Sequence, residues 1–246
     1  MKQWNWFMFL GVCFLGGSFA IYSLHYMIFG DSHFIFKYLV AQLGFLPINV
    51  FLVTIVLNKL MSRRDKRARL QKLNMIIGAF FSDLGSDLLR HLSWYDQNLD
   101  HNRENLVPTN NWSNQDFTQA RKNIAKLDFK LNLRENSLQS LHDYLSDKRP
   151  QLLAFLENPT LLEHEHFTDL IWAVFHLQDE LALRPDLYNL SELDTAHLSE
   201  DLRRVSQLLI MQWMDHMQHL QSSYPHLYSL ALRTNPFDTE ARVEIS

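Results

Sequence analysis

The sequence predicts an all-α protein in which a two-helix transmembrane hairpin is followed by a long helix and a cytosolic helical bundle. Three observations support this prediction. Two apolar runs near the N-terminus are each long enough to cross a bilayer, apolar residues beyond them recur at helical spacing, and no segment alternates with the period of two that is typical of a strand. With 246 residues, the chain has room for a membrane part and one further domain of ordinary size.

The two apolar runs cover residues 4–29 and 34–58. The first contains no Lys, Arg, Asp or Glu, and the second contains only Lys37, close to its start. A helix of about 20 residues crosses the hydrocarbon core of a membrane, so each run is long enough. Only Gly30 to His33 lies between them, which suits a tight turn and leaves no room for a re-entrant pore loop. We therefore expect residues 1–60 to form a transmembrane hairpin.

Basic residues directly after the second run predict the orientation of the hairpin. Residues 59–72 carry a net charge of +6, and the positive-inside rule places such a segment in the cytoplasm. Two spans then put both termini in the cytoplasm, and the compact chain favours a bacterial inner membrane. A cleaved signal peptide is the alternative for the first run, but its apolar part is too long. The basic cluster that would face anionic lipid headgroups consists of Lys59, Arg63, Arg64, Lys66, Arg67, Arg69 and Lys72.

Small and polar residues within the two runs predict how the hairpin packs. Small residues permit close contact between membrane helices, and polar ones hydrogen-bond within the hairpin or to a second copy of the chain. An oligomeric pore or carrier is the alternative, but it would require a polar stripe through the full membrane thickness, and no ionisable residue lies in mid-membrane. The candidate packing residues are Gly16, Gly17, Ala20, Gly44, Gln42 and Asn49.

A basic and amphipathic helix is expected to continue from residue 61 to about residue 97. Its apolar residues recur at spacings of three and four and form one stripe, which needs a partner. A bundle core, a parallel coiled coil between copies or the membrane surface could cover it. Gly78 and Gly85 weaken this helix locally. The stripe consists of Leu70, Leu73, Ile77, Phe80, Leu84, Leu88 and Leu92.

An Asn-rich segment that contains Pro108 predicts a linker over residues 98–113. Ser113 and Asp116 then suit the N-cap and the third residue of a helix. The bundle itself is expected over residues 114–233, followed by a loose polar tail at 234–246. Its predicted helices cover 114–130, 134–146, 150–157, 161–183 and 195–221, with a short last helix from Pro225.

Composition and motifs argue against several classes of function. From Leu73 onward the net charge is −11, which disfavours nucleic-acid binding. The sequence contains no phosphate-binding glycine loop, no nucleophile elbow and no His-Glu-x-x-His motif, so no catalytic residue is assigned. Cys13 is the only cysteine, which excludes an intrachain disulfide and a cysteine zinc site. No cofactor is expected, except that His and carboxylate side chains could hold a transition metal.

Two predicted bundle helices contain the candidate metal ligands. Glu163, inside the apolar face of helix 161–183, and His166, at the edge of that face, form a Glu-x-x-His pair. If this helix pairs antiparallel with helix 195–221, both lie near His216 and His219. A hydrogen-bonded polar cluster without metal is the favoured interpretation, and a metal site is the alternative.

Other acidic residues and histidines of these helices have simpler interpretations. Glu165, Asp169, His176 and Glu180 are expected on the solvent-facing side of helix 161–183. Asp194-x-x-His197 falls at a helix start, where Asp194 more naturally takes part in capping.

These features favour an integral membrane protein whose cytosolic domain acts by association. We expect an adaptor, sensor or regulatory module without catalysis, working in homo-oligomers and with an unidentified protein partner. The first alternative is a membrane-anchored, metal-binding helical enzyme, and the second is the oligomeric pore or carrier.

Overall fold

The computed structural model describes residues 2–96, 98, 104–127, 129–133, 138–161, 164–238 and 241–244. Within these residues every regular element is helical, and the only extended pairing is an isolated bridge between Asp96 and Leu131. The predicted all-α class is confirmed. The chain divides into two compact units, Met1–Lys66 and Arg67–Ser246, each of which has its own architecture.

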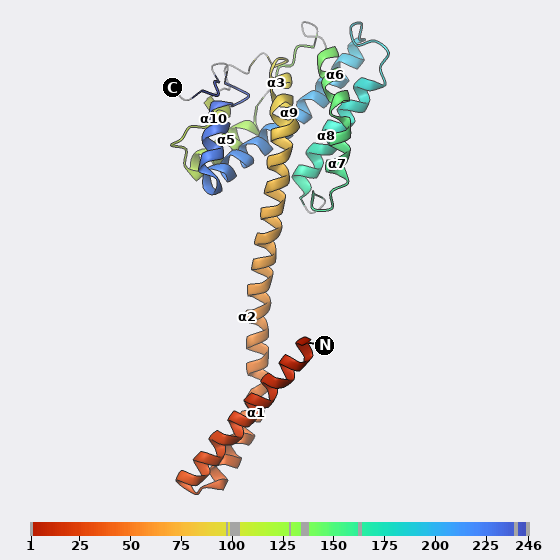
Figure 1. The fold of residues 1–246 in the computed structure, drawn as a ribbon. Coiled ribbons are helices and arrows are strands. Elements are labelled where there is room, and N and C mark those ends of the chain that lie inside the picture. Colours follow the sequence, from red (N-terminus) through yellow and green to blue (C-terminus); the bar gives the residue numbers. More distant parts are fainter. Residues whose placement is uncertain are drawn as a thin grey trace. The chain divides into compact units, whose positions relative to one another are not determined.

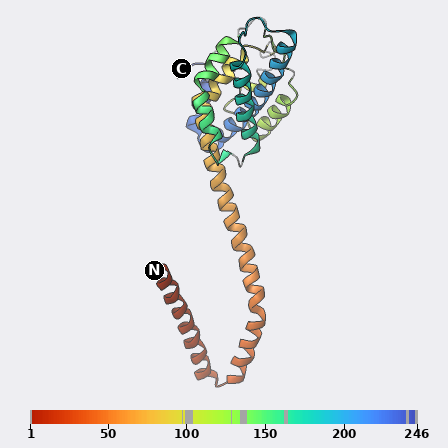
Figure 2. The ribbon, with the colours of Figure 1, turned by 90° about the vertical axis from the view of Figure 1, so that its right-hand side faces the viewer.

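The first unit is a helical hairpin. Helix α1 (Lys2–Phe29) meets helix α2 (Ser32–Phe80) at Gly30, whose φ of 66° favours glycine (Figure 2). Residues Trp6–Phe29 and the helical run that begins at Ser32 are long and apolar enough to cross a membrane. None of the side chains described in this unit is buried. The unit therefore leaves its apolar surface uncovered by protein.

The small residues predicted to pack the hairpin have open surroundings. A Cβ atom added at Gly16, Gly17 or Gly44 would meet no atom within 4 Å, and Ala20 and Asn49 are exposed. The Gln42 side chain donates a hydrogen bond of 2.9 Å to the Tyr38 hydroxyl, one turn earlier on the same helix. Gln42 is therefore satisfied within α2, and close packing of the small residues stays a prediction.

Helix α2 spans the boundary between the units and carries the whole basic cluster, residues 59–72, with exposed side chains. It runs into a π-helical turn, η1 (Phe81–Gly85), and then into α3 (Ser86–Ser93). Of the predicted apolar stripe, only Leu70 is exposed, and the other six residues are buried in the core of the second unit. A bundle core therefore covers this stripe.

The π-helical turn changes which residues face the core. A π-helix holds more residues per turn than an α-helix, and here the neighbours Phe80 and Phe81 are both buried. A Cβ atom at Gly85 would lie 2.6 Å from the Phe80 ring and 2.7 Å from the Phe81 ring, so a side chain there would displace one of the two rings. Gly85 thus permits the close packing of the turn.

The second unit has six further described helices of eight residues or more, and the longest, α9, contacts α3, α5, α8 and α10 (Figure 1). Its buried face includes Leu198, Leu202, Val205, Leu209 and Trp213. The six helices are α5 (Asn114–Ile124), α6 (Gln139–Asp147), α7 (Arg149–Leu156), α8 (Glu165–Ala182), α9 (Glu192–Ser223) and α10 (Pro225–Arg233).

The helix starts follow local capping chemistry. Ser113 and Asp116 form a reciprocal capping box at α5, as predicted, with the Ser113 amide donating to Asp116 Oδ2 at 2.7 Å. Helix α5 ends at Ile124, earlier than predicted, and Leu131 beyond it forms the isolated bridge to Asp96, with the Asn132 amide donating to the Tyr95 carbonyl at 2.9 Å. Residues 134–137, part of another predicted helix, lie outside the described residues.

Candidate functional site

The predicted metal ligands fall in different surroundings. Glu163 lies outside the described residues. His166 is exposed on α8, whereas His216 on α9 is buried and stacks on Phe81, with ring centroids 5.1 Å apart. His219 Nδ1 lies 3.2 Å from Nδ2, the side-chain amide nitrogen of Asn74. Among the residues described, the potential metal ligands that lie within 4.8 Å of one another are not the predicted ones. They belong to another cluster, between α8 and α9.

His216 and His219 line a groove of about 640 Å³ in the second unit. Its walls come from the end of α2, from η1 and α3, and from α9 and α10. Apolar atoms supply most of the lining surface, although about half of the lining side chains are polar or charged. The lining residues include Asn74, Met75, Gly78, Phe81, Asp87, Arg90, Trp213, His216, His219, Leu220, Tyr224, Leu227 and Leu230.

An aromatic group at the groove contains two nitrogen atoms without a hydrogen-bond partner. The Phe81 ring lies edge-on to Trp213, at a centroid distance of 5.3 Å, and stacks on His216 with an interplanar angle of 18°. In the described part of the chain, neither Trp213 Nε1 nor His216 Nδ1 has a partner, although both atoms are buried. Most buried polar groups are satisfied in native proteins, so these two atoms require an explanation.

The electrostatics of the groove favour neutral groups. Burial, assisted by the charge of His219, lowers the pKa of His216 from 6.5 to about 4. Burial also lowers the pKa of His219. The imidazole of His216 is therefore neutral near pH 7, with one nitrogen donating and the other accepting. Arg90 pairs with Asp87 on the same groove, so these two opposite charges offset each other.

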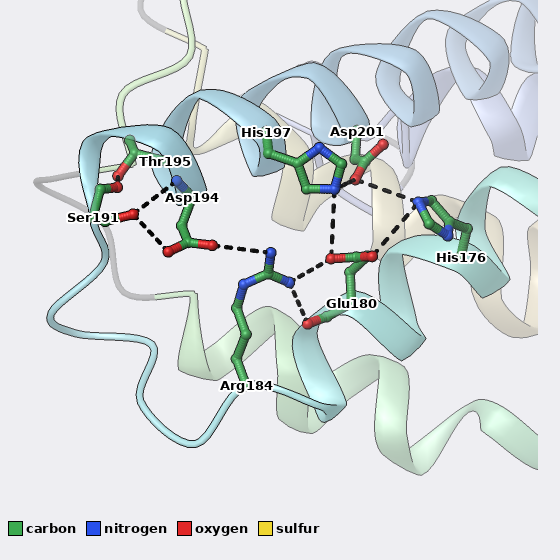
Figure 3. A network of polar contacts seen from close by, with 8 residues as sticks. All are labelled: His176, Glu180, Arg184, Ser191, Asp194, Thr195, His197 and Asp201. Carbon is green, nitrogen blue, oxygen red and sulfur yellow. Dashed lines mark hydrogen bonds and ion pairs between the residues drawn. The ribbon is translucent and has the colours of Figure 1, made fainter.

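A second polar cluster joins α8 to the first turns of α9 (Figure 3). Arg184 donates to Glu180 Oε2 at 2.6 Å and lies 3.5 Å from Asp194 Oδ1. The hydrogen bond from Arg184 lowers the pKa of Glu180, which is therefore ionised. Asp194 belongs to the start of α9, as predicted, because its amide donates to the side chain of the N-cap residue Ser191 at 3.1 Å.

Two histidines face the carboxylates of this cluster. Asp201 Oδ2 lies 3.6 Å from His176 Nε2 and 3.4 Å from His197 Nε2. Glu180 is opposite the same histidines, with Oε2 3.5 Å from His197 Nε2 and Oε1 4.0 Å from His176 Nε2. Only 5% of the Asp201 side chain is exposed, against about half of each imidazole. The predicted antiparallel pairing of the two helices places these residues level with one another.

Helical spacing predicted His176 and Glu180 on the solvent-facing side of helix 161–183. About half of the His176 imidazole is indeed exposed, but both residues also face partners on α9, which the prediction missed. A local signal was present. Each helix carries a histidine four residues before a carboxylate, His176 before Glu180 and His197 before Asp201. Such residues lie on one face of a helix. The antiparallel pairing that predicted His166 near His216 and His219 also predicts that these two His/carboxylate pairs lie opposite each other.

Comparison with known proteins identifies the family. Residues 69–233 match the family described as "Uncharacterized protein MJ1433, C-terminal helical domain", and residues 1–61 match "MJ1433, N-terminal helical domain". The chain is 38% identical over 241 residues to "Uncharacterized protein MJ1433" of Methanocaldococcus jannaschii. The aligned residues cover 98% of this chain and 97% of that protein. No solved structure matches. The chain therefore belongs to the MJ1433 family of helical proteins.

Proposed function

We propose that this protein is a membrane-anchored sensor without catalytic activity, whose helical second unit binds a small, mainly apolar molecule in the groove beside His216. The observation that carries this proposal is the aromatic group of the groove, in which Trp213 Nε1 and His216 Nδ1 are buried without hydrogen-bond partners among the described residues. A ligand with a hydrogen-bond acceptor, together with a small adjustment of the rings, would supply a partner for the tryptophan N–H.

The size and lining of the groove support a small-molecule ligand. Its volume of about 640 Å³ falls in the range usual for such sites, and an apolar lining with a few polar groups is typical of them. Met75, Leu220, Leu227 and Leu230 supply apolar contact area. The π-helical turn that contributes Phe81 is of a kind often found at functional sites.

The same groove is poorly equipped for proton transfer near neutral pH. His216 is a weak base because its pKa is about 4, and Asp87 is paired with Arg90. General acid–base catalysis is most efficient when the pKa of the group lies near the working pH. Binding without catalysis is therefore the function that these residues support.

The membrane anchor is proposed for the first unit. Its apolar side chains are exposed, and burying such surface stabilises a protein by about 25 cal/mol per Å². Lipid would cover these side chains, both termini would lie in the cytoplasm, and the basic cluster at 59–72 would contact anionic headgroups. Because the relative is archaeal, it lends no support to a specifically bacterial membrane, and the proposal is a cytoplasmic membrane.

Homo-oligomers and a protein partner belong to the same proposal. The second unit exposes large apolar side chains at Trp172, Leu183 and Leu193. Such residues are candidates for contact with a second copy or another protein. Cross-linking of the chain in native membranes, with replacement of Leu183 and Leu193 by Glu, would test whether this surface is used.

The groove can be tested with fluorine NMR of the full chain in detergent, labelled with 5-fluorotryptophan. The chain has six tryptophans, and the variant Trp213→Phe identifies the Trp213 signal. We expect some uncharged aromatic ketones or amides to shift this signal, whereas the signal of the exposed Trp172 stays in place. The proposal fails if no such compound shifts the Trp213 signal selectively.

A matched pair of variants at Gly78 localises the binding. A Cβ atom there would lie 3.6 Å from His216 Cε1, an ordinary contact, so a side chain fits without a clash at its base. Gly78→Leu would occupy the groove and abolish the shift of the Trp213 signal, and Gly78→Ala would retain it. Binding that survives Gly78→Leu would place the ligand elsewhere.

Topology is tested by labelling single cysteines with a membrane-impermeant maleimide in intact cells. In a Cys13→Ser background, Ser32→Cys lies at the hairpin turn and Asp169→Cys on the second unit, both at exposed positions. We expect labelling of the first in intact cells and of the second only after permeabilisation. The opposite pattern would reverse the proposed orientation.

A further inference from the structure

The cluster between α8 and α9 brings metal-binding atoms together with suitable spacing. His176 Nε2, His197 Nε2 and a carboxylate oxygen of Asp201 all lie within 4.8 Å of one another. The two distances to Asp201 Oδ2 are 3.6 and 3.4 Å. In a tetrahedral zinc site with bonds of about 2.0 to 2.1 Å, neighbouring ligand atoms are about 3.4 Å apart. The ligand atoms of the two histidines lie no more than 4.8 Å apart, so an ion would fit once the two half-exposed imidazoles move closer to each other.

We propose that His176, His197, Asp201 and Glu180 bind one divalent transition-metal ion, with Zn²⁺ the best match. Two imidazoles favour zinc and its first-row neighbours over Ca²⁺ and Mg²⁺, which prefer six or more oxygen ligands. The proposal is independent of the groove around His216 and requires only that α8 and α9 pair as they do here.

Helix geometry explains why these four side chains face one another. Each helix contributes a histidine and a carboxylate four residues apart, so both ligands of a pair project from one face. The antiparallel pairing sets His176 opposite Asp201 and Glu180 opposite His197 (Figure 3). All four side chains stand on two long helices rather than on loops, which preserves the spacing.

Asp201 is the buried anchor of the site. Its Oδ2 atom has no hydrogen-bond partner in the described part of the chain, and its side chain is 5% exposed. A buried carboxylate oxygen without a hydrogen bond is costly unless a cation lies beside it. A metal ion bound by both histidines would provide that cation.

Glu180 provides a fourth ligand through the oxygen that Arg184 does not use. Arg184 donates to Oε2 at 2.6 Å, and Oε1 is the oxygen on the side of His176. Arg184 and its second partner, Asp194, therefore orient Glu180 from outside the site. Such outer contacts hold ligands of metal sites in place.

The test is metal content and affinity of the full chain, purified in detergent without a histidine tag, stripped with a chelator and reloaded with Zn²⁺. We expect one zinc ion per chain, and with Co²⁺ the strong visible absorption of a tetrahedral site. His176→Ala and His197→Ala should abolish stoichiometric binding. Glu180→Gln should weaken it, because the change replaces a ligand carboxylate by an uncharged amide.

The controls separate this site from the cluster expected from the sequence. His166→Ala makes the same change on α8 outside the site, and His216→Phe changes the groove, and both should keep the metal. Asp201→Asn removes the buried anchor, with circular dichroism as the check on folding. If that variant misfolds, the two exposed histidine variants decide. Absence of stoichiometric metal, or metal lost in His166→Ala but retained in His176→Ala and His197→Ala, would overturn the proposal.

Discussion

Helix α9 carries histidines in two contrasting environments. Near its start, His197 is about half exposed and faces the carboxylates of Asp201 and Glu180. Near its end, His216 is 9% exposed and stacks on Phe81. Because neighbouring charges and burial decide the protonation state of an imidazole, one helix offers a metal-binding type of histidine at one end and a neutral, buried one at the other.

The largest contrast between the two ends should be in stability. Trp213→Ala removes a side chain that is 3% exposed, and such changes cost about 3–5 kcal/mol in the free energy of unfolding. In metal-free protein, His197→Ala should cost less than about 0.5 kcal/mol, as for most surface substitutions. Hydrogen exchange of α9 amides in the full chain measures both. Equal effects would mean that the two ends do not differ as described.

The second contrast is in pH dependence. Between the ordinary pKa of 6.5 and the folded-state pKa of about 4, His216 binds fewer protons when folded than when unfolded, so stability is lost as pH falls through this interval. At 1.36 kcal/mol per pKa unit, the loss is about 3 kcal/mol. His216→Phe should remove this part of the pH dependence of the unfolding free energy, and the phenyl ring should keep the stacking on Phe81.

The check on that prediction is the unfolding free energy at several pH values from 7.5 to 4. His219, Asp87, Arg90 and Tyr224 line the same groove and are unchanged in both proteins, so the difference between the two curves reports on His216. Parallel curves would show that His216 does not control the acid sensitivity.

A smaller effect is expected at the start of α9. Ser191 accepts a hydrogen bond from the Asp194 amide at 3.1 Å as the N-cap residue. Ser191→Ala should lower stability by about 1 kcal/mol, the typical value for such a cap. Ser191→Gly should cost only a few tenths of a kcal/mol. Comparing thermal unfolding of the two variants tests the cap, and a similar loss in both would argue against it.

The smallest effect has the opposite sign. Gly78 lies inside α2, and glycine in a helix interior is less favourable than alanine by about 0.5–1 kcal/mol. Since an added Cβ atom would only touch His216 Cε1 at 3.6 Å, Gly78→Ala should raise the melting temperature slightly. Gly85→Ala is the matched change and should lower it, because its Cβ atom would lie 2.6 Å from the Phe80 ring.

Much of the fold follows from local patterns. The apolar spacing predicted the core face of the α2–α3 run, and Ser113 with Asp116 predicted the start of α5. The same local patterns predicted the candidate sites less accurately. His216 and His219 drew attention as polar residues near an apolar face, yet their role as groove residues depends on η1 and α10, which pack from distant parts of the chain.

The sequence by itself determined the all-α class, the apolar hairpin segments and the apolar and polar faces of the long helices, because helix periodicity and segment length are local properties. Only the tertiary structure decided which histidines meet carboxylates and which are buried without charge. A helical wheel assigns a side chain to a face, but the partner on that face comes from another helix. His176 and Asp201 show this, since each has a partner four residues away on its own helix, but the two meet only when α8 lies against α9.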